Sequence, residues 1–362
     1  MKNSLALLAG LIVLAGCSDL ATNPQASAEP ESAAPSFAYW GTDNDLDGID
    51  DGTEWDLANT YAPVLFMPNL ISRAEAGAGV AGDWTWPASV PWYLANTQMR
   101  FHHDNCPDHQ ILNLGTITTS NVTTRSHQRA VSYLGCSHSG TTYTSANGGG
   151  FSTENHFFLQ AVYDDVTHPG QRDPSQWPVY FRVYRNFLGG YSIQYWYFFA
   201  YNDYIGSINH EGDWEHINVA LKADGTKDAV WYGQHNGEKL LWPYQVTWHN
   251  DTHPQVWIAD GSHASYSSEG ECDATMVEGT SESCWSNLGQ RWFTWSGGQG
   301  YDAGLQGAGL VNVGEAATLM PGQGWMKYSG RWGEVGALND LSVNGTSGPR
   351  SPIYQPSWTT DQ

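Results

Sequence analysis

Residues 209–221, NHEGDWEHINVAL, place acidic and imidazole side chains at the head of an apolar run. If this segment is a β-strand, alternate side chains share a face, so Asp213 and Glu215 lie on the same apolar face, roughly 7 Å apart. Two negative charges there are costly unless they share a proton or bind a cation. With His210 and Asp203 they would form an oxygen-rich shell that favours calcium, magnesium or manganese. A strand end with solvated charges is the alternative that periodicity leaves open.

A second acidic segment, residues 43–54 (DNDLDGIDDGTE), has the spacing of an EF-hand calcium loop. Gly48 takes the turn position. The ligand positions are Asp43, Asp45, Asp47, the Ile49 carbonyl, Asp51 and Glu54. Carboxylates so close together repel one another without a cation, so the spacing predicts bound calcium, and a solvated acidic linker is the alternative.

The residues around this loop predict one helix rather than two. Residues 37–40 have no helical pattern, whereas Glu54–Tyr61 can form about two turns before Pro63 stops the helix. The loop with its single helix resembles dockerin or thrombospondin-type calcium repeats, and we expect it to stiffen the start of the folded chain.

The elements that must position these residues are mainly strands. Gly (40) and Pro (17) punctuate the 362 residues, and aromatic side chains make up 13% of them, which is typical of a folded chain with many short strands. The expected strands include Val179–Tyr184, Tyr191–Tyr197, Glu215–Leu221, Gln255–Ala259 and Trp292–Trp295. We therefore predict an all-β, two-sheet sandwich over residues 62–362, with long loops at 102–155 and 267–320, preceded by the calcium-loop and helix module at 39–61.

Charge limits the partners. The chain has 37 acidic and 15 basic side chains, a net charge of -22, so phosphate backbones would repel it and nucleic-acid binding is disfavoured.

The N-terminus predicts export. Residues 1–16 have the layout of a signal peptide, because the apolar run Leu5–Ala15 is too short to span a membrane. The sequence LAGC resembles a bacterial lipobox, so we expect Cys17 to carry a lipid that anchors the chain to a membrane; an ordinary cleaved signal is the alternative. Ser18 favours sorting to the outer membrane, facing the periplasm or the exterior. Residues 17–38 read as a flexible tether.

The other cysteines are even in number, which in an exported protein favours disulfides. Sequence proximity favours Cys106–Cys136 and Cys272–Cys284. The competing prediction is a zinc site, because Cys106 is surrounded by the three histidines His102, His103 and His109. No close CxxC spacing supports zinc, so we expect disulfides.

Five segments between residues 60 and 360 carry a family resemblance. They are YWYFFAYND (195–203), HEGDWEHI (210–217), DGSHASY (260–266), GRWGE (330–334) and SGPRSPIYQPSW (347–358). In this order they resemble the vacuolar protein sorting sixty-two family. More distantly, NHEGDWE (209–215) resembles the heptapeptide GHRHDWE of the necrosis- and ethylene-inducing peptide-like cytolysins. Both resemblances imply a β-sandwich of jelly-roll character.

The cytolysin resemblance also implies a divalent-cation site. The matching positions are Asp203, His210, Asp213 and Glu215. The sequence departs from the heptapeptide where Glu211 replaces an arginine and Gly212 replaces a histidine.

Two functions of different classes follow. The first is a lipid-anchored binding protein whose metal-containing sandwich recognises a glycan or a lipid head group outside the cytoplasm. The alternative is a metal-dependent hydrolase or polysaccharide lyase that uses the same site, with His210 or His263 moving the proton. Ser262 beside His263 lacks the GxSxG elbow, so serine hydrolysis is not expected.

Overall fold

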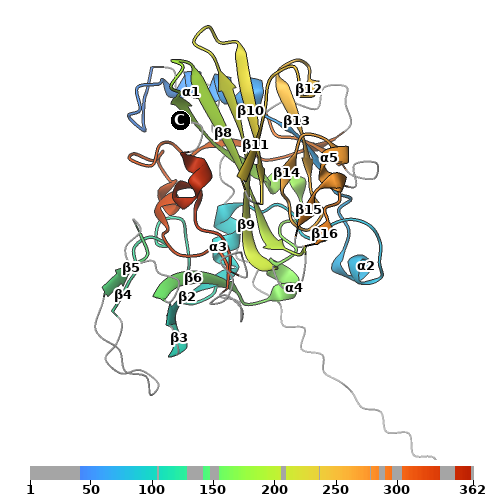
Figure 1. The fold of residues 1–362 in the computed structure, drawn as a ribbon. Coiled ribbons are helices and arrows are strands. Elements are labelled where there is room, and N and C mark those ends of the chain that lie inside the picture. The colour runs from blue at the N-terminus through green and yellow to red at the C-terminus, as the bar shows by residue number, and fades with distance from the viewer. Residues whose placement is uncertain are drawn as a thin grey trace, which may run out of the picture.

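The computed structural model describes residues 41–103, 106–128, 142–146, 155–204, 209–235, 237–277, 279–284, 290–295, 304–334 and 347–359 (Figure 1). The predicted signal peptide, tether and lipidated Cys17 lie outside these residues, as does Cys136.

The described chain is mostly β-sheet, as predicted, and two six-stranded sheets dominate it (Figure 1). The first sheet has the order β11 (Gly237–Leu241), β10 (Lys227–Gln234), β9 (His210–Leu221), β8 (Tyr191–Asn202), β7 (Pro178–Arg185) and β19 (Gly309–Asn312). The second has β12 (Trp248–His249), β13 (His253–Ile258), β1 (Val64–Met67), β17 (Gln290–Phe293) and β18 (Leu305–Gln306), with β14 (Ser265–Tyr266) paired to β13.

Pairing within these sheets is mixed. Most neighbouring strands are antiparallel, but β1 pairs parallel with β13, β17 with β18 and β19 with β7. Strand β1 therefore lies between strands that follow it by about 190 and 230 positions, as the register pairs Val64↔Gln255 and Val64↔Phe293 show. The short VLFM run of β1 gives no hint of these partners.

The two sheets pack face to face around one apolar core. Its members alternate along the strands, as with Phe181 and Val183 of β7, and they meet Leu65 and Val256 of the second sheet. A second core covers the opposite face of the first sheet, where Trp196, Phe198 and Trp214 pack. Both faces of β8 and β9 are therefore buried, which explains why these strands are apolar almost throughout.

Short elements complete both cores and the surface. The helices are α1 (Asp51–Tyr61), α2 (Arg73–Gly77), α3 (Val90–Ala95), α4 (Asp164–Thr167) and α5 (Glu269–Ala274), with 3-10 turns η1 (Pro174–Gln176), η2 (Gly324–Lys327), η3 (Pro352–Tyr354) and η4 (Pro356–Trp358). None of the described helices is long and apolar enough to cross a membrane.

The two stretches predicted as long loops contain further strands. The first holds β3 (Cys106–Leu112), which joins β2 (Thr97–His103) and β6 (Asn155–Ala161) in a three-stranded sheet, and the ribbon of β4 (Ser126–Gln128) with β5 (Thr142–Thr144). The second holds the ribbon of β15 (Met276–Val277) with β16 (Thr280–Ser281), besides α5 and three strands of the large sheets. Their small polar residues hid strands too short to show periodicity.

His253 joins the end of α1 to the second sheet and gives the fold an acid-sensitive point. Its Nδ1 lies 2.7 Å from the Ala62 carbonyl oxygen, and its ring stacks on Trp295 with centroids 3.6 Å apart. Burial, assisted by the neighbouring His249, lowers the pKa of His253 from 6.5 to about 4. In the folded chain His253 therefore binds a proton less readily than it does in the unfolded chain.

We therefore expect the stability contributed by neutral His253 to be present above about pH 6.5 and to be lost as the pH falls towards 4. His253→Gln does not titrate, so the free energy of unfolding of this variant should decline less between pH 6.5 and pH 4. Urea unfolding across that range measures it. An equal decline in the wild type and in His253→Gln would contradict the assignment.

Candidate metal and ligand-binding sites

Strands β8 and β9 carry the predicted central site as an antiparallel pair. Phe199 faces Asp213, and Tyr197 faces Glu215. Further along β9, Ile217, Val219 and Leu221 belong to the core between the sheets, whereas Trp214 belongs to the core on the other face. The alternation predicted from the sequence is confirmed, and the two carboxylates head an inward-facing apolar stripe.

His263 compensates one of these carboxylates. Its Nδ1 lies 2.9 Å from Asp213 Oδ2, while its Nε2 lies 3.1 Å from Asp83 Oδ2 and 2.9 Å from Thr85 Oγ1. The imidazole is fully buried and stacks on Phe199, with centroids 3.7 Å apart and planes 3° from parallel. One ring therefore joins two carboxylates from segments 130 residues apart.

The charges in this network follow from its geometry. Burial opposes the charged forms, but the hydrogen bonds to Asp213 and Asp83 outweigh it and raise the pKa of His263 to about 9. Bonds from His210 and His263 likewise overcome burial and hold the pKa of Asp213 well below its usual range. The same balance lowers the pKa of Asp83. His263 is thus an imidazolium between two carboxylates.

The pKa of Glu215 is shifted in the opposite direction from that of Asp213. Burial raises its pKa well above the usual range, and the charges of Asp213 and Glu282 add to the effect. Glu282 is itself buried and accepts from Ser262 Oγ at 2.8 Å, with His235 Nε2 2.5 Å from its other oxygen. The surroundings of Glu215 therefore favour its protonated form.

The structure brings together only part of the predicted cation shell. His210 Nε2 lies 3.5 Å from Asp213 Oδ1. Asp203 instead accepts from Trp84 Nε1 and Asn209 Nδ2, both at 2.6 Å. Among the described residues, the groups whose metal-ligating atoms all lie within 4.8 Å do not include Asp203, His210, Asp213 and Glu215 as a set. The four side chains therefore do not converge as one ligand group in this structure, and His263 is the positively charged group beside Asp213.

A pocket of about 820 Å³ opens beside this network, over α2 and the end of β8. Its aromatic side chains include Trp84, Tyr201 and Tyr204, and its acidic lining includes Asp164, Asp203, Asp260 and the buried Asp83. Arg73 lies over the Trp84 ring at 4.9 Å. Asp83 thus joins the pocket to His263, although neither His263 nor Asp213 lines it.

One cluster in the pocket wall was missed in the sequence. His168 Nε2 lies 3.1 Å from Glu211 Oε1 and 3.9 Å from Asp164 Oδ1, and its ring stacks on Tyr201 at 4.1 Å. Glu211 also accepts from the backbone N–H groups of Ala161 and Glu334. His168 follows a four-residue helix in a polar stretch, so no local pattern marked it.

The segments that carry the family resemblance meet around Glu211 and Gly212. Gly212 has φ +65°, and a Cβ there would lie 2.2 Å from the Trp332 carbonyl oxygen. A Cβ at Gly333 would lie 2.0 Å from the Glu211 carbonyl oxygen, and one at Gly348 would lie 2.4 Å from it. Gly333 of GRWGE and Gly348 of SGPRSP are thus required by close backbone approach to β9.

The acidic loop before α1 gathers its carboxylates into two overlapping groups. Asp43 accepts from the backbone N–H groups of Asp47 and Gly48 at 3.2 and 3.0 Å, and Asp47 accepts from Ile49 N–H at 2.7 Å. Ile49 packs its side chain into the core between the sheets. Two groups have ligand atoms that all lie within 4.8 Å of one another: Asp43, Asp45 and Asp51, and Asp45, Asp47 and Glu54. Asp45 belongs to both groups.

Two carboxylates of this loop are buried towards the common centre. Asp45 is 2% exposed and Glu54 is 0% exposed. Among the described residues, both side-chain oxygens of Asp45 lack a hydrogen-bond partner, and so does Oε1 of Glu54. The other oxygen of Glu54, Oε2, accepts a hydrogen bond from Asn312. Burial, reinforced by the neighbouring aspartates, raises the pKa of Asp45 to about 7 and that of Glu54 to about 9. The donor set of hard oxygens fits calcium.

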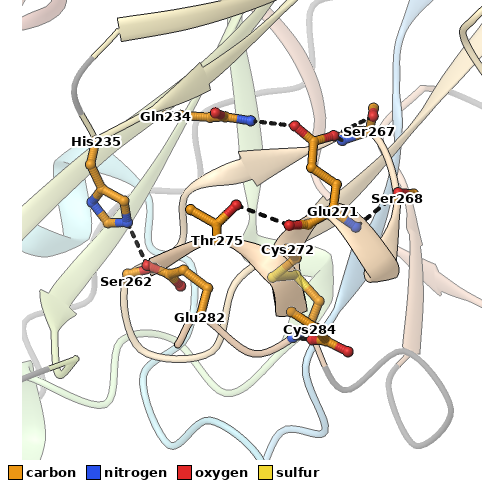
Figure 2. The surroundings of a disulfide bond; sticks show 11 residues. Gln234, His235, Ser262, Ser267, Ser268, Glu271, Cys272, Thr275, Glu282 and Cys284 are labelled. Atoms are coloured by element: carbon orange, nitrogen blue, oxygen red, sulfur yellow. Dashed lines mark hydrogen bonds and ion pairs between the residues drawn. A yellow bond between two sulfur atoms is a disulfide. The ribbon is translucent and has the colours of Figure 1, made fainter. Parts of the chain in front are cut away.

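The Cys272–Cys284 disulfide is present, as sequence proximity predicted (Figure 2). It links α5 to the segment after β16. Figure 2 shows Glu271 on the same helix accepting from Gln234 and Ser267, while His235 meets Glu282. The bond therefore secures a segment that reaches the pocket through Ser281 and Ser283. Cys106 is disulfide-bonded as well, but its predicted partner Cys136 lies outside the described residues, so the Cys106–Cys136 pairing stays a prediction.

No protein-family model and no curated protein matches the chain. Among solved structures, it is similar to Necrosis and Ethylene inducing Protein 2 from the causal agent of cocoa's witches' broom disease, with 22% identity, 28% of this chain and 50% of that chain covered, and a TM-score of 0.24. It is also similar to NLPPya in complex with glucosamine, with 15% identity, 50% of this chain and 66% of that chain covered, and a TM-score of 0.27. A third structure, described as a toxin fold for microbial attack and plant defense, has 15% identity, 49% of this chain and 63% of that chain covered, and a TM-score of 0.28.

These neighbours are toxin-fold proteins of the necrosis- and ethylene-inducing type, at low identity and partial coverage. The chain spans about half to two thirds of their length. Likeness at these TM-scores carries no argument about function. The resemblance to the vacuolar protein sorting sixty-two family has no support from the comparisons.

Proposed function

We propose that this chain is a membrane-anchored, extracytoplasmic binding protein that holds a sugar of a glycan or a lipid head group in the pocket over α2 and the end of β8. The observation that carries the proposal is the lining of that pocket, which combines aromatic rings with carboxylates and an amide. The anchor would be the lipid on Cys17 that the sequence predicts, with residues 17–38 as its tether.

The chemistry of the lining suits a polyhydroxylated ligand. Sugar hydroxyl groups are donors, and Asp164, Asp203 and Asp260 are acceptors, while Asn209 offers both functions. Aromatic faces such as that of Tyr201 pack against the apolar faces of a sugar ring. The volume of about 820 Å³ is within the usual range for small-ligand sites. The acidic lining favours neutral or cationic sugars over acidic ones.

The predicted central cation at Asp203, His210, Asp213 and Glu215 is not part of this proposal, since Asp203 already accepts from Trp84 and Asn209, and His263 is the buried cation beside Asp213. The calcium ion of this proposal binds the loop before α1, where it would stabilise the junction between the tether and the sandwich.

Isothermal calorimetry with a panel of neutral, amino and acidic oligosaccharides tests the proposal on the full chain. Asp203→Asn keeps an acceptor for Trp84 but removes a charged acceptor from the pocket. We expect it to weaken binding by at least about tenfold, because a hydrogen bond to a charged group contributes about 1.5–3 kcal/mol.

Tyr244→Ala is the matched control, since Tyr244 is 84% exposed and does not line the pocket. It should bind as the wild type does. If no sugar binds, or if both variants lose affinity equally, the pocket is not the site. Chain-shortened or unsaturated products in the same mixtures would instead identify the hydrolase or lyase alternative.

A further inference from the structure

Three histidines converge at the end of the molecule opposite α1. His103 ends β2, His109 lies in β3 and His127 lies in β4, and Figure 1 shows these strands far from α1. Each offers a ring nitrogen, and the three nitrogens all lie within 4.8 Å of one another. The ring centroids are 4.3 Å apart for His103 and His109, 4.6 Å for His109 and His127, and 5.4 Å for His103 and His127.

The strand geometry explains this convergence. The β2–β3 register pairs Phe101 with His109 and has irregularities around it, which place His109 beside His103. Phe101 shares the face of His103 and also contacts the His127 ring at 4.6 Å. His102, one position earlier than His103, points to the other face and meets Asp108 at 2.9 Å. Strand alternation therefore selects His103 and excludes His102.

Burial and charge define what this cluster can hold. His103 is 0% exposed and His109 is 4% exposed, whereas His127 is half-buried. Three protonated rings this close would repel one another. Neutral rings can instead direct their lone pairs at one cation, and nitrogen donors suit zinc rather than calcium or magnesium.

We propose that His103, His109 and His127 bind a zinc ion. The sequence raised zinc only for His102, His103 and His109 with Cys106. The structure replaces His102 with His127, and Cys106 is disulfide-bonded and so offers no thiolate. Three histidines with a fourth position open to water is an established zinc arrangement.

The ion would have a structural consequence. Strands β4 and β5 pair only with each other among the described residues, and a two-stranded ribbon has little stability of its own. His127 is the metal-binding side chain that this ribbon contributes, so zinc would link β4 to the β2–β3 hairpin. The proposal does not depend on sugar binding, because the histidines lie outside the pocket lining.

Zinc chloride titrated into metal-free protein, in buffer with excess calcium to fill oxygen-rich sites, tests the proposal by calorimetry. We expect one zinc per chain. His127→Ala removes the half-buried ligand, and His109→Gln removes a second ligand. Each variant should weaken zinc binding by at least about tenfold, because losing even a hydrogen-bond partner of a metal ligand weakens metal affinity by about that factor. His102→Ala, on the same strand but the other face, should bind as the wild type does.

Cobalt(II) in place of zinc provides a second readout, because a four-coordinate site gives strong visible absorption that should vanish in His127→Ala. Near-ultraviolet circular dichroism verifies that each variant is folded. A wild type that binds no zinc, or binding that survives unchanged in both ligand variants, would overturn the proposal. So would an equal loss in His102→Ala.

Discussion

Replacing His263 with leucine is expected to lower the free energy of unfolding by about 3–5 kcal/mol, the cost of breaking a buried ion pair by removing one partner. The imidazolium lies between Asp83 and Asp213, and its loss leaves Asp83 buried without this positive charge and Asp213 with only His210 beside it. The leucine also loses the flat stacking on Phe199. Urea denaturation at pH 6 measures the change.

A double-mutant cycle separates charge from packing. In the His263→Leu background, Asp213→Asn removes a charge that has lost its partner, so it should cost less than it does in the wild type. Equal costs in both backgrounds would show that the pair is not coupled. His249→Leu, a histidine outside this network, is the control for a general loss of imidazole and should have a much smaller effect.

The pH dependence has a definite sign. The pKa of His263 is raised from 6.5 to about 9, so its contribution is complete below about pH 6.5 and declines as the pH rises towards 9. The pKa values of Asp83 and Asp213 are lowered from 3.8, so their contribution is present above that pH and is lost in stronger acid. The stability difference between wild type and His263→Leu should therefore be largest between about pH 4 and pH 6.5.

Calcium added to metal-free protein is expected to raise the free energy of unfolding by about 2.7 kcal/mol when its concentration is 100 times the dissociation constant. The reason is the loop before α1, where Asp45 and Glu54 are buried towards shared ligand groups. Thermal unfolding over a calcium series measures it. Asp45→Asn should abolish most of this gain, because Asp45 belongs to both ligand groups.

The sign of the variant's effect should also reverse without calcium. Asp45→Asn removes one of several repelling carboxylates, so metal-free Asp45→Asn should be at least as stable as metal-free wild type. Asp56→Asn changes the same charge at an exposed position of α1 and should keep the full calcium response. A wild type whose stability ignores calcium would show that the loop is a solvated acidic segment.

Local patterns explain what could be predicted from the sequence. The strands of the first sheet are apolar runs, and period-two alternation placed Asp213 and Glu215 on the inner face correctly. The acidic loop has a fixed ligand spacing, and the loop between Cys272 and Cys284 is short enough for proximity to indicate their pairing. Each of these signals lies within about a dozen residues.

The partners of those residues could not be read in the same way. Asp83, His168 and His127 are single side chains that the fold brings in from distant segments. A single polar residue in a polar stretch of sequence creates no periodic pattern, so nothing local indicates its role. His263 was weighed as a site residue, but its role as the charge partner of Asp213 depends on Asp83 from the other side of the core. The parallel partners of β1 likewise depend on topology, not on its four residues.

The place of β1 determines the order in which the molecule can assemble. Its hydrogen-bonding edges are filled by residues 255–257 on one side and 290–293 on the other. A chain that emerges from its N-terminus therefore keeps one edge of this strand unpaired until four fifths of the 362 residues are available. Closing loops of that size makes folding slow, since contacts distant in sequence form late. Truncations that end before residue 290 should leave one edge of β1 unprotected and aggregate.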